Sequence, residues 1–170
     1  MPPAPLMAIR IELLSATHAR SSFDCGDEAL NEFLRRFAGQ QQRRGLGKTY
    51  VAVDVRSAEV AGFVTLSVGQ VAARVMPPQL KLPRYPVPVL RMGRLGVDKR
   101  SQGLGIGQDL LAFALRLAVE FSEKVGLYAV VVDAKDERVA AFYRKLGFEA
   151  TLDDPLCLFI PVSKLAQAST

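Results

Sequence analysis

Histidine and cysteine are scarce in this chain of 170 residues, which contains one His and two Cys. Cys25 and Cys157 lie far apart in the sequence, so the ligand spacing of a zinc site is missing and we expect no metal. Two such cysteines are most simply interpreted as reduced thiols, which predicts a cytoplasmic location. No apolar run approaches the ~18 residues that a membrane-spanning helix needs, so we expect no membrane partner. The Pro-rich residues 1–7 do not have the pattern of a secretory signal.

Acidic residues are scarce in the first 100 positions, where 15 Lys and Arg outnumber 8 Asp and Glu and the net charge is +7. Residues 101–170 carry 7 basic and 9 acidic residues, a net charge of −2. The basic excess lies in residues 35–48, which contain no acid, and in residues 74–100, which contain only Asp98. Such a stripe suits a polyanionic partner, and a solvated basic face with arginines paired to local acids explains it equally well. The basic residues of interest are Arg35, Arg36, Arg43, Arg44, Lys48, Arg74, Arg91 and Arg94.

The order of apolar patterns predicts a single mixed α/β domain over residues 1–170. Asp27 is placed to cap the first helix, and five prolines in residues 76–88 require a loop with at most a turn of helix. Strands are expected at residues 8–14, 50–55, 60–68, 89–97, 127–132, 148–151 and 157–162, and helices at residues 27–42, 105–124 and 136–146. The expected buried positions of these helices are Ala29, Leu30, Phe33, Leu34 and Phe37, then Leu110, Leu111, Ala114, Leu117, Ala118 and Phe121, then Phe142 and Leu146 with Phe148 after them.

A glycine-rich segment joins the strand that ends at Val97 to the long helix that follows. Glycines let backbone N–H groups approach an anion, and a helix start adds unsatisfied N–H groups and the positive end of the helix dipole. The segment therefore predicts a phosphate site, although the same residues without a ligand form a plain strand-to-helix turn. A Walker A loop is excluded, because Gln108-Asp109 stands where Lys-Ser or Lys-Thr is needed, and the Gly-x-Gly-x-Gly spacing differs from that of a dinucleotide fingerprint. The residues of the segment are Gln102, Gly103, Leu104, Gly105, Ile106 and Gly107.

Tyr143 follows Phe142 on the last predicted helix, so we expect it to point away from the apolar face. When an amine displaces a thiolate from a thioester, the thiolate takes up a proton. A phenol has a pKa of about 10 and a thiol about 8.5, so donation by a tyrosine costs only one or two pKa units. Tyr143 is therefore a candidate general acid. The alternative is a tyrosine that packs its ring and bonds its hydroxyl to the backbone.

Together these residues resemble the GNAT superfamily of N-acetyltransferases. Its cofactor motif, Gln/Arg-x-x-Gly-x-Gly/Ala, is matched by residues 102–107, and Phe142-Tyr143-x-x-x-Gly147-Phe148 resembles its later tyrosine motif. The resemblance implies acetyl-CoA as cosubstrate, Tyr143 as the catalytic residue, and a central mixed, mostly antiparallel sheet flanked by helices. Gly96 departs from the family, in which alanine is common, and is expected to loosen its strand. The implied cofactor-binding residues are Leu95, Gly96 and Val97, whose backbone would bond the pantetheine arm, with Gln102, Gly103, Leu104, Gly105, Ile106, Gly107 and Phe142.

A closer resemblance, to the acetyltransferase toxins of bacterial toxin–antitoxin pairs (the TacT and AtaT type), extends from His18 to Pro161. It implies acetylation of the α-amino group of aminoacyl-tRNA, which stops translation, and neutralisation by a ribbon-helix-helix antitoxin. It also allows a homodimer. An α-amino group with a pKa near 8 needs little help to lose its proton, which fits a site without an obvious strong base. The segments that carry the resemblance are Phe23-Asp24-Cys25-Gly26, Leu30-Asn31-x-Phe33-Leu34, Thr49-Tyr50-Val51, Pro86-Val87-Pro88-Val89-Leu90, Arg94-Leu95-Gly96-Val97-Asp98 and Val131-Val132-Asp133-Ala134.

With such a substrate, the eight basic residues named above would bind tRNA phosphates. Of Arg91 and Arg94, one would face the tRNA and the other would pair with an acid. The same core would also serve an acetyltransferase for a protein or small-molecule amine, with an incidental basic stripe, or a non-catalytic module that keeps the fold. We expect His18 and Cys25 to be structural and Cys157 to lie in the core of the last strand.

Overall fold

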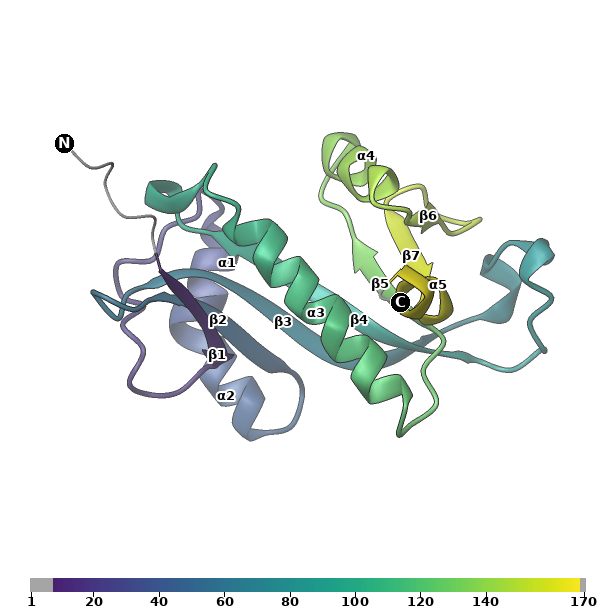
Figure 1. The fold of residues 1–170 in the computed structure, drawn as a ribbon, viewed down its shortest axis with the longest axis horizontal. Coiled ribbons are helices and arrows are strands. Elements are labelled where there is room, and N and C mark those ends of the chain that lie inside the picture. The colour runs from purple at the N-terminus through teal and green to yellow at the C-terminus, as the bar shows by residue number, and fades with distance from the viewer. Residues whose placement is uncertain (1–7, 169–170) are drawn as a thin grey trace. The chain divides into compact units, whose positions relative to one another are not determined.

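The computed structural model describes residues 8–168, and the elements follow the predicted order with one added helix (Figure 1). The strands are β1 (Ile9–Leu13), β2 (Lys48–Asp54), β3 (Val60–Val71), β4 (Val87–Val97), β5 (Ala129–Asp133), β6 (Glu149–Ala150) and β7 (Cys157–Pro161). The helices are α1 (Glu28–Glu32), α2 (Ala38–Arg43), α3 (Ile106–Ser122), α4 (Glu137–Lys145) and α5 (Val162–Ala168), with short helical turns η1 (Phe33–Phe37), η2 (Ala73–Val75), η3 (Pro78–Leu80) and η4 (Lys99–Ser101).

Within residues 8–168 the strands form a seven-stranded sheet in the order β1-β2-β3-β4-β5-β7-β6. The pairs β1–β2, β5–β7 and β6–β7 are antiparallel. The pair β4–β5 is parallel, with Val89 opposite Ala129 and Met92 opposite Val132. The predicted mixed, mostly antiparallel sheet is therefore confirmed.

The chain divides into two compact units, which are described separately. The first contains residues up to 65 together with residues 94–113, and the second contains residues 66–93 and the chain from residue 114 onward. The elements β3, β4 and α3 contribute residues to both units. The expectation of one N-acetyltransferase domain over residues 1–170 stays a prediction.

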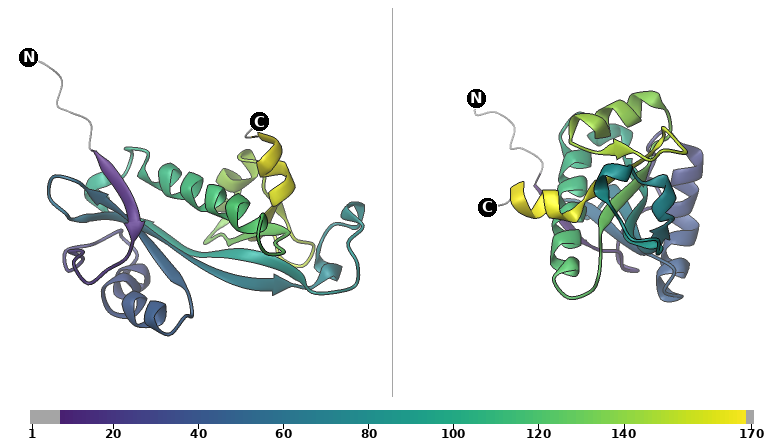
Figure 2. Two further views of the ribbon diagram at one scale, coloured as in Figure 1. Left: turned by 60° about the horizontal axis from the view of Figure 1, so that its bottom comes forward. Right: turned by 90° about the vertical axis from the view of Figure 1, so that its right-hand side faces the viewer.

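In the first unit, helices lie on both faces of the strands (Figure 2). Strand β2 alternates accordingly, because successive side chains of a strand point to opposite faces. Val51 and Val53 join a buried cluster with Phe33 of the α1–α2 segment. On the other face, the Tyr50 ring lies 4.8 Å from the Phe113 ring of α3, between centroids. The amino-terminal half of α3 is thereby fixed against the strands of this unit.

In the second unit, β5 is covered on both faces, as its continuous apolar sequence predicts: residues Ala129–Val132 are at most 1% exposed. On one face, Val131 and Phe159 pack with Met76 of the Pro-rich loop. On the other face, β7 presents Ile160 toward Gly147, which follows α4. The Pro-rich loop thus belongs to the core of this unit and contains only the short turns that its prolines allow.

The first helical segment differs from the single α-helix predicted over residues 27–42. It begins as expected, because the Asp27 carboxylate accepts hydrogen bonds from two N–H groups of the first turn of α1. Residues Phe33–Phe37 then form a π-helical turn, in which the Ala38 N–H donates to the Phe33 carbonyl, five residues earlier. The wider turn shifts the buried face by one residue, so Ala38 is buried and Phe37 is 41% exposed. The predicted burial is wrong for Ala29 and Phe37 and is confirmed for Phe33 and Leu34.

Helix α4 presents a different face from the one predicted. Tyr143 is only 5% exposed, whereas Phe142 is 37% and Leu146 is 47% exposed. The buried face is formed by Ala140 and Tyr143, which lie three residues apart on one side of the helix. The expected core positions Phe142 and Leu146, and the expected outward direction of Tyr143, are therefore wrong. Burial of Phe148 is confirmed.

The end of the described chain also differs from the prediction. Val162, expected to close the last strand, instead begins α5. Strand β6 is reduced to Glu149–Ala150. Strand β3 extends to Val71, three residues beyond the predicted end. The predictions for residues 1–7 lie outside the described residues.

Candidate active site

The glycine-rich segment lies in the first unit, between the end of β4 and the start of α3, and Asp98 holds its beginning. Asp98 is 2% exposed, and its carboxylate accepts hydrogen bonds from the backbone N–H groups of Asp24 and Arg100, at 3.1 and 2.9 Å. The Arg100 guanidinium donates two more, at 3.0 and 3.1 Å. Burial pushes the pKa of Asp98 upward, but the hydrogen bonds from Arg100 and the backbone outweigh it and leave the pKa below its usual value. Asp98 is therefore an ionised anchor for the loop.

The Gln102 side chain fixes the middle of the segment. Its Nε2 donates to the carbonyl oxygens of Val97, at 3.0 Å, and Cys25, at 3.3 Å. This residue is therefore part of the scaffold that shapes the turn, a role that the motif alone does not reveal. Its amide group bonds carbonyl oxygens and engages no N–H group of the glycines that follow.

The turn after Gln102 has the geometry of an anion cradle. Gly103 and Gly105 have φ angles of +82° and +86°, which residues with a Cβ rarely adopt. Apart from each glycine's two chain neighbours, no described residue has an atom within 4 Å of a Cβ built on Gly103 or Gly105, so the backbone is open to a ligand there. Helix α3 begins at Ile106, and its first bonded N–H is that of Asp109, which donates to the Gly105 carbonyl at 3.0 Å. The N–H groups of residues 106–108 therefore have no acceptor within the helix, and they form its positive dipole end. A diphosphate fits this cradle because it needs N–H donors, positive potential and open space.

The adjacent strand residues Leu95, Gly96 and Val97 close β4. Gly96 is buried, and a Cβ built on it would lie 3.1 Å from Phe63 Cε1 and 3.4 Å from Cys25 Sγ. An alanine here would force Phe63 or Cys25 to move. Phe63 and Cys25 thus occupy the space that an alanine methyl group would fill. Their packing against Gly96 offsets the expected loosening of the strand. Bonding of the strand backbone to a pantetheine arm stays a prediction.

Tyr143 lies in the second unit within an aromatic cluster. Its ring centroid is 5.4 Å from that of Phe142 and 5.2 Å from that of Phe148, both edge-on. Burial raises the pKa of Tyr143 to about 12. The phenol is therefore fully protonated at neutral pH, as a general acid requires. Its proton is also more costly to donate than that of a tyrosine with the ordinary pKa of about 10. Phe142, the other aromatic of the motif, is partly exposed and open to contact.

The basic residues divide into paired and unpaired groups. Arg91 pairs with Asp133 at 2.5 Å, whereas Arg94 stacks on the Phe33 ring, 3.8 Å from its centroid. Arg91 is thus the acid-paired member of the two. Four others have no recorded acidic partner among residues 8–168: Arg43, Arg44, Lys48 and Arg74, all exposed.

Arg35 and Arg36 serve local structure. The Arg35 guanidinium donates to the Phe23 carbonyl at 2.8 and 3.2 Å, and Arg36 pairs with Glu32 one turn earlier at 3.1 Å. Both interpretations of the basic residues therefore apply, each to a different subset. Arg35, Arg36 and Arg91 are held by local partners, whereas the unpaired residues are available to a polyanion.

His18 and the cysteines occupy structural positions. His18 Nδ1 accepts from the Ser15 N–H at 2.9 Å, so Nε2 carries the proton and donates to Glu12 at 2.7 Å. The Cys25 N–H donates to the buried Asn31 side chain at 2.8 Å, and burial raises the pKa of the Cys25 thiol. Cys157 begins β7 half-buried, and burial raises the pKa of its thiol as well. Neither cysteine has the lowered pKa of a reactive thiol.

Sequence reasoning missed Asp98 and Arg100 as loop anchors. The available signal was Asp98 as the lone acid in residues 74–100. Within the described part of the chain, no group of three or more His, Cys, Asp or Glu could hold a metal ion. No helix there is long and apolar enough to cross a membrane.

Comparison with known proteins adds to this geometry. Residues 45–150 match the acetyltransferase (GNAT) domain family. A tRNA-acetylating toxin from Mycobacterium tuberculosis (strain ATCC 25618 / H37Rv) is 34% identical over 142 residues, which cover 82% of this chain and 84% of the toxin.

Two solved structures have the same fold along nearly their whole length. The toxin AtaT complexed with acetyl-methionyl-tRNAfMet is 30% identical, with a TM-score of 0.89 and coverage of 96% of this chain and 100% of that one. A tyrosine-to-phenylalanine mutant of AtaT, bound to acetyl-CoA and the C-terminus of the antitoxin AtaR, is 28% identical, with a TM-score of 0.83 and coverage of 95% and 98%. Together with the glycine loop at the start of α3, these matches establish that the chain belongs to the GNAT family of acetyl-CoA-dependent N-acetyltransferases.

Proposed function

We propose that this protein is a toxin that transfers an acetyl group from acetyl-CoA to the α-amino group of an aminoacyl-tRNA and thereby blocks translation. The observation that carries the proposal is the open, N–H-lined turn at Gly103 and Gly105, directly before α3. Support for the acceptor comes from the likeness to a tRNA-acetylating toxin and to AtaT complexed with acetyl-methionyl-tRNAfMet.

The cofactor-binding role falls to residues 102–107, with Leu95, Gly96, Val97 and Phe142. The N–H groups of the turn and of the α3 start would bind the pyrophosphate, and the strand backbone would bond the pantetheine arm. Asp98, Arg100 and Gln102 hold the turn in shape through the hydrogen bonds described above. The cosubstrate supplies an activated acetyl group as a thioester.

Tyr143 would act as general acid. The amine forms a bond to the acetyl carbon, the carbon–sulfur bond breaks, and the departing thiolate takes the Tyr143 hydroxyl proton. The tyrosinate regains a proton as the acetylated nitrogen loses its own to solvent. With a pKa of about 12 for Tyr143 and about 8.5 for a thiol, donation is uphill by about 3.5 pKa units, or about 5 kcal/mol. A turnover of about 10 per second allows a barrier of about 16 kcal/mol, so the step remains accessible.

The tRNA surface would be formed by the basic residues without acidic partners, namely Arg43, Arg44, Lys48 and Arg74, together with Arg94. Arg35, Arg36 and Arg91 are held by neighbours and would contribute mainly to the local positive potential. The affinity for tRNA should fall steeply as salt rises.

The proposed setting follows from these substrates. Aminoacyl-tRNA and acetyl-CoA meet in the cytoplasm, where we place the protein. We propose a ribbon-helix-helix antitoxin as its neutralising partner, supported by the AtaT structure with the C-terminus of AtaR. A homodimer and a single domain over residues 1–170 are part of the same proposal.

The role of Tyr143 is tested by Tyr143→Phe, which removes only the hydroxyl. We expect a loss of about 10²–10⁴-fold in acetylation rate, the usual contribution of a general acid. Acetyl-CoA affinity, measured by calorimetry, should stay within about twofold. Full activity of the variant would refute the general-acid role, and loss of acetyl-CoA binding would show that Tyr143 serves the fold or the cofactor instead.

A further inference from the structure

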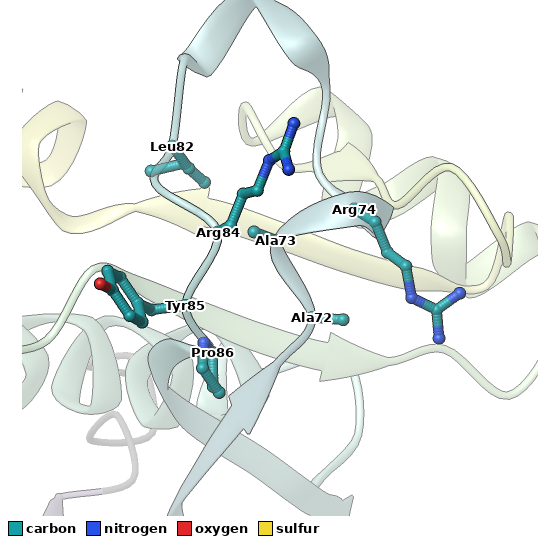
Figure 3. A pocket seen from close by; sticks show the side chains of 7 residues that line it. All are labelled: Ala72, Ala73, Arg74, Leu82, Arg84, Tyr85 and Pro86. Atoms are coloured by element: carbon teal, nitrogen blue, oxygen red, sulfur yellow. The ribbon is translucent and has the colours of Figure 1, made fainter.

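The base of the Pro-rich loop between β3 and β4, in the second unit, surrounds a hollow of about 550 Å³ (Figure 3). Ala72, Ala73 and Arg74 line it from the segment that leaves β3, and Arg84, Tyr85 and Pro86 from the segment that returns to β4. Its volume lies within the ~300–1,000 Å³ of small-ligand sites. None of the roles proposed above uses Arg84 or Tyr85.

The walls of the hollow are held in place by the core of the unit. Ala73 and Leu82, both in its lining, pack against the buried cluster that contains Met76 and Phe159. The Leu152 N–H also donates to the Val75 carbonyl at 2.8 Å, which fastens the first segment of the loop. Prolines fix φ at several positions of residues 76–88. The hollow is therefore formed before a ligand arrives, which lowers the entropic cost of binding.

The chemistry of the lining favours a nucleotide. Tyr85 is 75% exposed, an unusual position for a large aromatic ring. Arg74 and Arg84 are exposed, and the structure records no acidic partner for either within residues 8–168. Residues 66–93 contain no Asp or Glu at all. The Tyr85 ring and the two unpaired guanidinium groups all line the hollow but point to different sides of it (Figure 3). This arrangement suits a base on one side and the phosphates of the neighbouring nucleotides on the others, whereas an apolar peptide would leave both charges without a partner.

We propose that this hollow binds an unpaired nucleotide of the tRNA substrate, with the base stacked on Tyr85 and the adjoining phosphates bound by Arg74 and Arg84. The inference rests on the proposed function, because it assumes a tRNA acceptor. It adds a stacking site to a surface that is otherwise described only by its charge. Stacking requires an unpaired base, so the site would distinguish single-stranded from fully paired RNA.

Fluorescence anisotropy tests the proposal with two RNA hairpins whose loops are a linker without bases, one with a single-stranded 3′ overhang and one with a blunt end. Tyr85→Ala should weaken binding of the overhang hairpin by about 5- to 150-fold, the equivalent of ~1–3 kcal/mol for one stacked base. Tyr85→Phe, which keeps the ring, should stay within about twofold of the wild type. The affinity for the blunt hairpin should be the same for the wild type, Tyr85→Ala and Tyr85→Phe. Because Tyr85 is exposed, unchanged thermal unfolding will verify that each variant is folded.

The two arginines have a separate readout. In the double variant Arg74→Gln/Arg84→Gln, the slope of log affinity against log salt for the overhang hairpin should fall by about 1.4, or about 0.7 for each single-strand phosphate contact. Equal overhang binding by wild type and Tyr85→Ala would overturn the proposal. So would an equal loss on both hairpins, or a loss of antitoxin-peptide binding with RNA binding intact. If the wild type acetylates no aminoacyl-tRNA, the proposed function itself fails, which a separate activity assay decides.

Discussion

Replacing Gly105 by alanine is the sharpest perturbation of the turn that we propose binds the cofactor pyrophosphate. Gly105 has a φ angle of +86°, and among the described residues nothing lies within 4 Å of a Cβ built there. The new methyl group therefore contacts no described residue other than its chain neighbours, and its effect on stability comes from backbone strain. The same methyl group would occupy the space into which a pyrophosphate must come to reach the N–H groups of the turn.

The two effects have different magnitudes. A left-handed conformation costs a residue with a Cβ about 1–2 kcal/mol, which corresponds to a fall in melting temperature of about 2–8 °C for a chain of this size. Loss of one hydrogen bond from the backbone to a charged phosphate costs about 1.5–3 kcal/mol. Acetyl-CoA should therefore bind Gly105→Ala about 10- to 150-fold more weakly than the wild type.

A matched control is available at Gly45, which has a φ angle of +75° and equally open surroundings within the described chain. Gly45 lies just after α2, outside the proposed pyrophosphate-binding turn. Gly45→Ala should show the same fall in melting temperature with unchanged acetyl-CoA affinity. Calorimetric titration of acetyl-CoA and a thermal scan of both variants give the comparison. Equal acetyl-CoA affinity in the wild type and Gly105→Ala would refute the assignment of the pyrophosphate to this turn.

Three further predictions follow from the charges and burial of single residues. Because burial raises the pKa of Tyr143 from 10.0 to about 12, the folded state holds this proton more tightly than the unfolded chain, so the free energy of unfolding should fall by about 2–3 kcal/mol as pH rises from 10 to 12. Denaturant titrations should show that Tyr143→Phe lacks this part of the alkaline loss. Asp98→Asn should lower the free energy of unfolding by about 2–3 kcal/mol at pH 7, since it removes charge-assisted hydrogen bonds. Because the pKa of Asp98 is lowered from 3.8, this stabilisation is present above pH 4 and is lost as pH falls below it. The free energies of unfolding of the wild type and Asp98→Asn should therefore converge in acid. A difference that stays constant with pH would contradict the anchor role. In the double variant Arg43→Glu/Arg44→Glu, the slope of log tRNA affinity against log salt should fall by about 1.8. Arg116→Glu changes an exposed residue outside residues 35–48 and 74–100 and should leave this slope unchanged. Equal slopes for the wild type and the double variant would remove both arginines from the tRNA surface.

Much of the fold was predictable, because it follows from local patterns. The cap at Asp27, the strand-to-glycine-to-helix order after Val97 and the buried run that became β5 each depend on residues close in the sequence. The parts that were not predictable depend on distant residues. Asp98 anchors the loop through Asp24, 74 positions earlier, and no local pattern marks that contact.

The buried face of α4 was also not predictable from the local sequence. Two aromatic residues stand side by side, and the helix has only nine residues, too few for periodicity to decide which one is buried. Tertiary packing decides it, because Tyr143 lies against Phe148, which follows the turn at Gly147. In the same way, the π-helical turn at Phe33–Phe37 shifts a buried position by one residue without any Gly or Pro in the turn to mark it. These differences place Tyr143, the proposed general acid, in a buried position that raises its pKa.

Mass spectrometry of a charged tRNA, incubated with the protein and acetyl-CoA, tests the central claim most directly. The account predicts one added acetyl group, located on the α-amino group of the amino acid, with wild-type protein and only a trace with Tyr143→Phe. An unmodified aminoacyl-tRNA, in a reaction where the same preparation binds acetyl-CoA, would contradict it.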